Sequence, residues 1–218
     1  MSDPESRRLL VRHTTGERTT HWTLALAFVL GALSGLALFH PALFWLSELF
    51  GGGPWTRILH PYVGLIAVLV FLLFAAGLWG DARLTPADRQ WLRQMQDVVH
   101  NREDRLPEVG RYNPGQKLLF WVLLVGMLGL LLSGIVMWRA WFGLYFPVSL
   151  IRLASLVHAV CAFVLICGII VHVYSAFWIK GSVEGMVRGT VTPGWAWKHH
   201  RAWFRQVTHD AHPRTRSN

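Results

Sequence analysis

The sequence predicts an all-α fold in which four transmembrane helices form a bundle. Of the 218 residues, 53% are hydrophobic, the mean hydropathy is positive, and the apolar residues form long runs rather than amphipathic stripes. Four of these runs reach the roughly 20 residues that a helix needs to cross a bilayer. They cover about residues 20–39, 58–79, 118–138 and 150–178. We expect helices because the runs lack the alternation typical of membrane β-strands.

Positively charged residues indicate how the bundle is oriented. Lys and Arg gather before the first run, in the loop of residues 80–117 and in the C-terminal tail. In the connections 39–57 and 138–152 the only Lys or Arg residues are Arg57, Arg139 and Arg152. Because short cytoplasmic segments are enriched in Lys and Arg, both termini and the middle loop are predicted to be cytoplasmic. The net charge of +9 then reflects membrane topology, and we expect membrane lipid rather than nucleic acid as the partner.

The predicted organisation is a transmembrane domain, residues 1–178, followed by a basic cytoplasmic tail, residues 179–218. The tail is rich in aromatic and basic residues but lacks a run of spanning length. We therefore expect it to lie on the membrane surface as a cap. His199 and His200 in this tail are expected to be solvated, because adjacent residues on a helix face different ways and chelate a metal poorly.

Two histidines stand inside the fourth apolar run, where hydrocarbon is expected. His158 and His172 are fourteen residues apart, so at about 100° per residue they return to within about 40° of the same helix face. The helix rise places them about 21 Å apart along the axis, one toward each side of a bilayer core about 30 Å thick. Ionisable residues inside a span are costly and usually functional, so both are candidate site residues.

The predicted topology supplies each of these histidines with a partner. His21 lies at the inner end of the first span. His60 lies at the outer end of the second, where it is expected at the helix start with Pro61 in the first turn. The fourth span runs from outside to inside, which puts His158 in its outer third and His172 near its inner end. The prediction is an outer pair, His60 with His158, and an inner pair, His21 with His172.

Two imidazoles without a carboxylate or thiolate indicate haem rather than a single metal ion. Zinc wants at least three protein ligands, whereas a porphyrin supplies its own nitrogens and needs only two axial bases. Each pair is therefore predicted to hold the iron of one non-covalent haem b, without an open position for oxygen. Cys161 and Cys167 form no C-x-x-C-H motif and are too few for an iron–sulfur cluster. The third span, which contains no ionisable residue, is expected to contribute walls and no ligands.

A polar turn precedes the third span. Its residues, 109–117, read V-G-R-Y-N-P-G-Q-K, and Asn-Pro-Gly predicts a turn. Asn113 is a candidate cap for the helix that follows. The other interpretation is a polar pocket at the membrane edge, which a quinone headgroup would need.

Motifs spread over almost the whole chain are similar to those of a known family. They are His21-Trp22, Ser34-Gly35, Arg57-Ile58-Leu59-His60-Pro61, Val109-Gly110-Arg111-Tyr112-Asn113, Gly115-Gln116-Lys117, His158, His172-Val173-Tyr174, Ala176-Phe177-Trp178-Ile179-Lys180-Gly181-Ser182 and Lys198-His199-His200. The chain resembles the cytochrome b (gamma) subunit of membrane-bound respiratory formate dehydrogenases. The resemblance implies a four-helix protein of the bacterial inner membrane that holds two b-type haems.

The resemblance also assigns the site residues. His60 and His158 would hold the outer haem, and His21 and His172 the inner haem. Asn113, Gly115 and Gln116 would form a quinone site on the cytoplasmic side, next to the inner haem. Pro114 departs from the small residue expected at its position in this turn.

The implied function is transmembrane electron transfer. A molybdenum or tungsten catalytic (alpha) subunit outside the membrane would oxidise formate, and an iron–sulfur (beta) subunit would pass electrons to the outer haem. This chain would carry them to menaquinone or ubiquinone without itself oxidising formate. A higher oligomer of the heterotrimer is compatible with this assignment.

Two alternatives stay open beside formate dehydrogenase. The first is the cytochrome b subunit of a nickel–iron hydrogenase or a related quinone-linked oxidoreductase, against which the turn motif argues. The second, from a different class, is a non-redox membrane anchor, which would have no need for histidines at matched levels.

Overall fold

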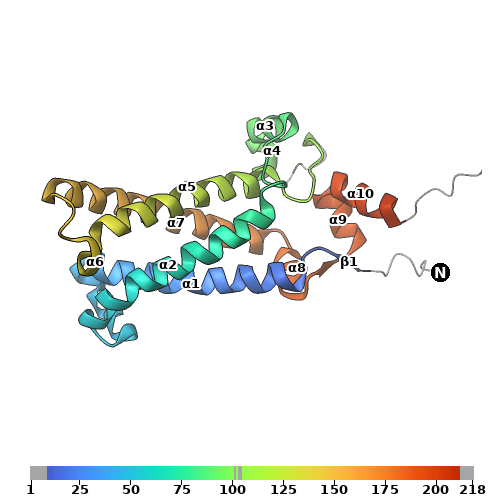
Figure 1. The fold of residues 1–218 in the computed structure, drawn as a ribbon. Helices are drawn as coiled ribbons and strands as arrows, with labels where there is room; N and C mark the ends of the chain where they lie inside the picture. The colour runs from blue at the N-terminus through green and yellow to red at the C-terminus, as the bar shows by residue number, and fades with distance from the viewer. Residues whose placement is uncertain (1–8, 101, 103–104, 212–218) are drawn as a thin grey trace, which may run out of the picture. The chain divides into compact units, whose positions relative to one another are not determined.

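The computed structural model describes residues 9–100, 102 and 105–211, and most of these are helical. Four helices are long and apolar enough to cross a membrane, which confirms the four predicted spans (Figure 1). They are α1 (Thr15–Phe39), α2 (Gly53–Leu78), α5 (Pro114–Met137) and α7 (Val148–Trp178). The shorter elements are β1 (Leu10–Val11), η2 (Pro41–Phe50), α3 (Pro86–Arg93), α4 (Met95–Val99), α6 (Arg139–Phe142), α8 (Ser182–Arg188), β2 (Thr190–Val191), α9 (Pro193–His199) and α10 (Arg201–Ala211).

The described chain folds as two compact units. The bundle unit comprises residues 16–77 and 121–175, and so contains most of the four long helices. The terminal unit comprises the described parts of residues 1–15, 78–120 and 176–218. The division into a transmembrane domain, residues 1–178, and a tail, residues 179–218, stays a prediction.

Glycines on α5 allow α7 to approach closely in the bundle unit. A Cβ atom added to Gly126 would lie 2.6 Å from Cδ2 of Leu165, and one added to Gly129 would lie 2.6 Å from Sγ of Cys161. Helices in lipid associate chiefly by van der Waals packing, which small residues improve because they bring the backbones together. Helix α5 therefore has the packing role that its sequence predicts.

Helix α2 begins earlier than the sequence predicts. The connection before it contains η2 and ends at Gly51 and Gly52, whose φ angles of 85° and 90° are in the left-handed region. Helix α2 then starts at Gly53, so Pro61 lies inside the helix and not in its first turn. The prediction that Pro61 occupies the first turn is wrong, and Pro54 occupies it instead. Proline is tolerated there because an N–H in the first turn has no partner within the helix.

The earlier start places His60 well within α2. It follows Gly53 by seven residues, about 10 Å along the axis, while His158 follows the start of α7 by ten residues, about 15 Å. Both histidines of the predicted outer pair are therefore interior helix residues. The expectation that His60 stands at a helix start is wrong.

The terminal unit joins both ends of the described chain. Strand β1 pairs with β2 in an antiparallel ladder, with Leu10 opposite Val191. Val191, Ala196 and Trp203 form its buried apolar cluster. Leu10, Trp195, Phe204 and Val207 pack against this cluster.

Within the same unit, a buried ion pair ties α3 to the start of α5. Lys117 Nζ lies 2.8 Å from Asp88 Oδ2, and both side chains are largely shielded from solvent. Asp88 also accepts from the backbone N–H of Thr85, whose hydroxyl caps the helix in return. Burial by itself would raise the pKa of Asp88, but the hydrogen bonds from Lys117 and Thr85 lower it.

Candidate functional site

The bundle unit brings together the two histidines of the predicted outer pair. His60 on α2 and His158 on α7 face each other with ring centroids 6.2 Å apart and an interplanar angle of 72°. Nδ1 of His60 lies 2.8 Å from Ser34 Oγ on α1, and Nδ1 of His158 lies 2.9 Å from Ser133 Oγ on α5. Side chains from all four long helices therefore meet around this pair.

The histidines of the predicted inner pair also face each other. His21 on α1 and His172 on α7 have ring centroids 6.3 Å apart and an interplanar angle of 53°. Phe74 on α2 packs against His21 at 6.2 Å, and Trp22 contacts the same ring edge-to-face at 5.2 Å. Nδ1 of His21 is buried and has no hydrogen-bond partner among the described residues.

The spacing within each pair suits one metal atom between two rings. A metal–imidazole nitrogen bond is about 2 Å long and the ring centroid lies about 1 Å beyond the nitrogen, so two axial imidazoles place their centroids about 6 Å apart. The separations of 6.2 and 6.3 Å have this size. Each pair therefore offers two nitrogens, which is the protein share of a six-coordinate haem. Among the residues that the structure describes, no group of three or more His, Cys, Asp or Glu side chains forms a metal site.

Sequence reasoning missed Ser34 and Ser133 as contacts of the histidine pair. Both serines are buried, and each lies in the tripeptide Leu-Ser-Gly, which occurs once on α1 and once on α5. That repeat is the signal that would have found them. The expectation that α5 supplies only walls is therefore incomplete, because Ser133 is a polar contact of His158.

The turn before α5 lies in the terminal unit and forms a reciprocal cap. The backbone N–H of Gln116 donates to Asn113 Oδ1, and the backbone N–H of Asn113 donates to Gln116 Oε1, both at 2.9 Å. Pro114 is buried at the first position of the helix. The structure thus contains the predicted Asn113 cap, and both bonds use the carbonyl oxygens of the side-chain amides. The –NH₂ groups of both side chains take no part in the cap, so their N–H donors remain available.

The expectation that both tail histidines are solvated is wrong for His200. Its side chain is buried, and its Nδ1 donates to the backbone carbonyl of Gly110 at 2.8 Å. Burial and the neighbouring Arg12 guanidinium lower the pKa of His200 to about 3. His40, by contrast, caps η2 by accepting from the backbone N–H of Ala42 at 3.2 Å.

The buried Arg12 links β1 to the loop before α5 inside the terminal unit. Its Nη2 donates to the backbone carbonyl of Arg111, and Arg111 donates in return to the carbonyl of Arg12 at 3.2 Å. The guanidinium lies 4.7 Å from the centroid of the Trp203 ring. These contacts hold the turn that carries Asn113 against the C-terminal helices of the same unit.

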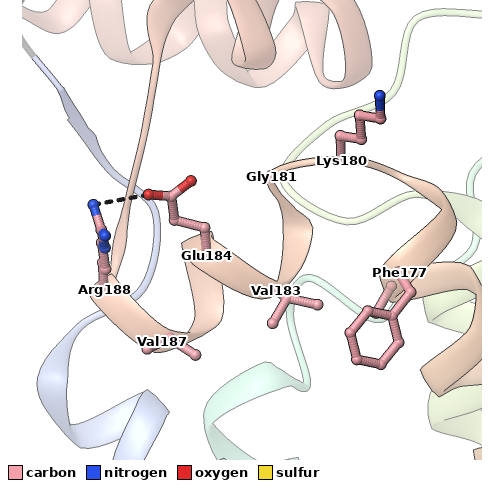
Figure 2. A pocket seen from close by; sticks show the side chains of 8 residues that line it. Phe177, Lys180, Gly181, Val183, Glu184, Val187 and Arg188 are labelled. Atoms are coloured by element: carbon pink, nitrogen blue, oxygen red, sulfur yellow. Dashed lines mark ion pairs between the residues drawn. The ribbon is translucent and has the colours of Figure 1, made fainter.

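An open pocket in the terminal unit lies between the end of α7 and α8 (Figure 2). Its polar wall contains Lys180 and the exposed ion pair of Glu184 with Arg188, whose atoms are 2.9 Å apart. It contains none of the predicted site residues.

Comparisons with known proteins show the family to which the chain belongs. The profile of the prokaryotic cytochrome b561 family matches residues 12–189. The chain is 40% identical over 197 residues to the formate dehydrogenase cytochrome b556 subunit of Haemophilus influenzae, covering 90% of this chain and 83% of that protein.

Two relatives from Escherichia coli K12 are equally similar. They are the nitrate-inducible formate dehydrogenase cytochrome b556(Fdn) subunit and the formate dehydrogenase cytochrome b556(fdo) subunit, each 39% identical over 201 residues. The alignments cover 92% of this chain and 92% and 94% of the respective relatives. The chain therefore belongs to the prokaryotic cytochrome b561 family and, within it, to the formate dehydrogenase cytochrome b subunits.

Proposed function

We propose that this chain is the membrane electron-transfer subunit of a formate dehydrogenase complex. It accepts electrons from an iron–sulfur partner outside the membrane and delivers them to a quinone on the cytoplasmic side. The observation that carries the proposal is the presence of two histidine pairs with metal-ligand spacing in one helical bundle. The names of the relatives favour formate dehydrogenase over the nickel–iron hydrogenase alternative.

The four paired histidines are the proposed axial ligands, and membership of a cytochrome b561 family implies haem b. His60 and His158 hold one haem, and His21 and His172 hold the other. When bound, haem with two axial histidines supplies a one-electron carrier without an open iron position. Helix α7 contributes a ligand to both sites, and its rise separates His158 from His172 by about 21 Å.

The charge distribution supports the proposed orientation. With Lys and Arg concentrated in the two terminal segments and the loop 80–117, both termini lie in the cytoplasm of a bacterium and the chain is a multi-pass protein of the inner membrane. The His60–His158 pair is then the outer one, facing the iron–sulfur subunit. Formate is oxidised in a separate molybdenum or tungsten subunit, and the complex is a heterotrimer or an oligomer of heterotrimers.

The proposed quinone site is the turn formed by Asn113, Gly115 and Gln116. A quinone presents carbonyl oxygens, which need hydrogen-bond donors, and the amide –NH₂ groups of Asn113 and Gln116 are such donors. Menaquinone and ubiquinone both present the carbonyl groups that these donors recognise.

Spectroscopy of membranes that contain the chain tests the haem assignment. We expect a b-type α band in the reduced-minus-oxidised spectrum and loss of about half of it in His60→Ala or in His21→Ala. The double variant that combines both substitutions should have no band. His40→Ala is the matched control, since His40 caps η2 and belongs to neither pair. A band that survives in the double variant contradicts the proposal.

The quinone assignment is tested with a substitution that preserves the helix cap. Gln116→Glu keeps an oxygen that accepts from the Asn113 N–H but removes the –NH₂ donor. In the assembled complex we expect slower quinol formation while formate still reduces both haems. Glu108→Gln, a change at an exposed ion pair of the same unit, is the control. Unchanged quinol formation in Gln116→Glu would remove this residue from the site.

A further inference from the structure

The two histidines of the His60–His158 pair lie against the same tripeptide on different helices. Leu33-Ser34-Gly35 on α1 contacts His60, and Leu132-Ser133-Gly134 on α5 contacts His158. In each case the serine lies at Nδ1 of the ring and the glycine lies at Cε1. We refer to the two tripeptides as the Leu-Ser-Gly cradles.

The serine of each cradle determines which ring nitrogen carries the proton. Ser34 Oγ lies 2.8 Å from the carbonyl oxygen of Leu30, and Ser133 Oγ lies 2.5 Å from that of Gly129. A hydroxyl has one proton, so a serine that donates to its own helix can only accept from the imidazole. The hydrogen bond at Nδ1 is therefore Nδ1–H to Oγ, which leaves the lone pair on Nε2.

The glycine of each cradle leaves room for the same ring. A Cβ atom on Gly35 would lie 3.1 Å from Cε1 of His60, and one on Gly134 would lie 3.5 Å from Cε1 of His158. The imidazole therefore fills the space that a Cβ atom would occupy, and each glycine lets the ring approach the neighbouring helix closely. The hydrogen bond at Nδ1 then orients the ring, and with it the Nε2 lone pair.

The His21–His172 pair lacks this arrangement within the described residues. Nδ1 of His21 is buried without a hydrogen-bond partner, and no ring hydrogen bond of His172 occurs in the part of the chain that is described. The two pairs have the same ring spacing but different surroundings. The rings of His60 and His158 each have an Nδ1–H to Oγ hydrogen bond, and the rings of His21 and His172 have none among the described residues.

We infer that the Leu-Ser-Gly cradles are positioning elements that lower the midpoint potential of the haem at His60 and His158 relative to the haem at His21 and His172. The inference rests on the proposed function. A hydrogen bond from Nδ1–H makes the imidazole more basic and stabilises the more highly charged ferric iron. Electrons that enter at the His60–His158 pair then pass downhill to the His21–His172 pair, so the cradles give the transfer its direction.

Redox titration of membranes that contain the chain, with the α band followed against potential, tests this inference. In Ser34→Ala the haem that depends on His60 and His158 should rise in potential, and the other haem should not move. A net hydrogen bond is worth about a tenfold change in an equilibrium constant, which for a one-electron couple is about 59 mV. Ser34→Thr keeps the hydroxyl and should restore the original value.

Ser133 provides a second test and Ser175 the matched control. Because Ser133 Oγ lies 2.9 Å from Nδ1 of His158, Ser133→Ala should raise the same potential as Ser34→Ala does. Ser175 on α7 also donates to a carbonyl of its own helix, that of Val171 at 2.8 Å, and it lies in neither cradle. Ser175→Ala should leave both potentials unchanged.

The possible results separate this inference from the proposed function. If the unaltered chain has no b-type band, the proposed function fails. If both haems are present and Ser34→Ala moves neither potential, or moves both equally, the inference is overturned while the function stands. Should Ser34→Ala not accumulate haem, Ser34→Cys keeps the volume and weakens the acceptor, and an unmoved potential in that variant equally counts against the inference.

Discussion

Gly35 on α1 lies directly against the imidazole of His60 on α2, where an added Cβ atom would be only 3.1 Å from Cε1. Few Cβ contacts in proteins are this close, so the ring would have to move by a few tenths of an ångström to admit a methyl group. The equivalent distance at Gly134 and His158 is 3.5 Å, an ordinary van der Waals contact. The two cradles therefore differ in their tolerance of a methyl group.

This difference predicts unequal effects of two identical substitutions. Gly35→Ala should weaken haem binding at the His60–His158 pair by about 10-fold or more, as displacement of a ligand by its neighbours generally does. Gly134→Ala should retain nearly all of it. Haem content per chain, measured as the pyridine haemochrome, gives the comparison. Equal haem loss in both variants would mean that the close contact at Gly35 has no role.

The Asp88–Lys117 pair should stabilise the terminal unit far more than an exposed pair does. In Asp88→Ala the buried ammonium of Lys117 loses its anionic partner and keeps the Arg83 carbonyl, and breaking a buried ion pair typically costs about 3–5 kcal/mol. Hydrogen exchange of the α3 amides should accelerate by at least about 100-fold. Glu184→Ala, which removes an exposed partner of Arg188, should change exchange in α8 by less than about 3-fold. Similar acceleration in both variants would contradict the assigned role of burial.

His200 should make the terminal unit less stable in acid. Its pKa is about 3 in the folded chain against 6.5 in the unfolded chain, so the unfolded chain binds the extra proton between these values. The contribution of neutral His200 to the free energy of unfolding is therefore fully present above about pH 6.5. It falls by up to about 1.4 kcal/mol per pH unit as the pH decreases toward 3.

The measurement compares thermal unfolding of the chain in detergent at pH 7 and pH 5. His200→Gln should lose less stability over this interval than the unaltered chain, because the substituted side chain takes up no proton. The exposed His209 provides the control substitution, His209→Gln. An unchanged pH dependence in His200→Gln would show that another group is responsible.

Arg12 should not be replaceable by lysine. The guanidinium donates to the Arg111 carbonyl and stacks 4.7 Å from the Trp203 ring, and an ammonium cannot reproduce both contacts. Arg12→Lys should destabilise the terminal unit by about 2–3 kcal/mol and increase chymotryptic cleavage of the loop 105–113. Arg205→Lys, at an exposed ion pair with Glu108, should have little effect. Equal cleavage of the two variants would contradict this prediction.

The four long helices could be predicted from composition because the bilayer core offers the backbone no hydrogen-bond partners. Runs of about 20 apolar residues have to satisfy their backbone hydrogen bonds internally, so a helix is the only local solution. The start of α2 was harder to predict, since two prolines, Pro54 and Pro61, both resemble first-turn residues and only the geometry of Gly51 and Gly52 shows which one is.

The pairing of the four histidines could be anticipated, but their neighbours could not. His60 and His158 are distant in sequence, and alternating helix direction with fixed helix rise is enough to place them at a common level. Which side chain touches Nδ1 depends on how each helix is rotated about its axis. No local periodicity records that rotation, so the contacts of Ser34 and Ser133 emerged only from the packed bundle.

The sequence by itself determined the number of spans, the approximate helix limits and the grouping of four histidines into two pairs. It did so because the thickness of the bilayer and the helix rise act on every residue in the same way. Tertiary structure decided which contacts each functional side chain makes: the serine and glycine at His60, and the burial of His200 against the Gly110 carbonyl. Such contacts are made or lost when neighbouring elements shift by a few tenths of an ångström, and only the packing of the whole unit determines their positions that closely.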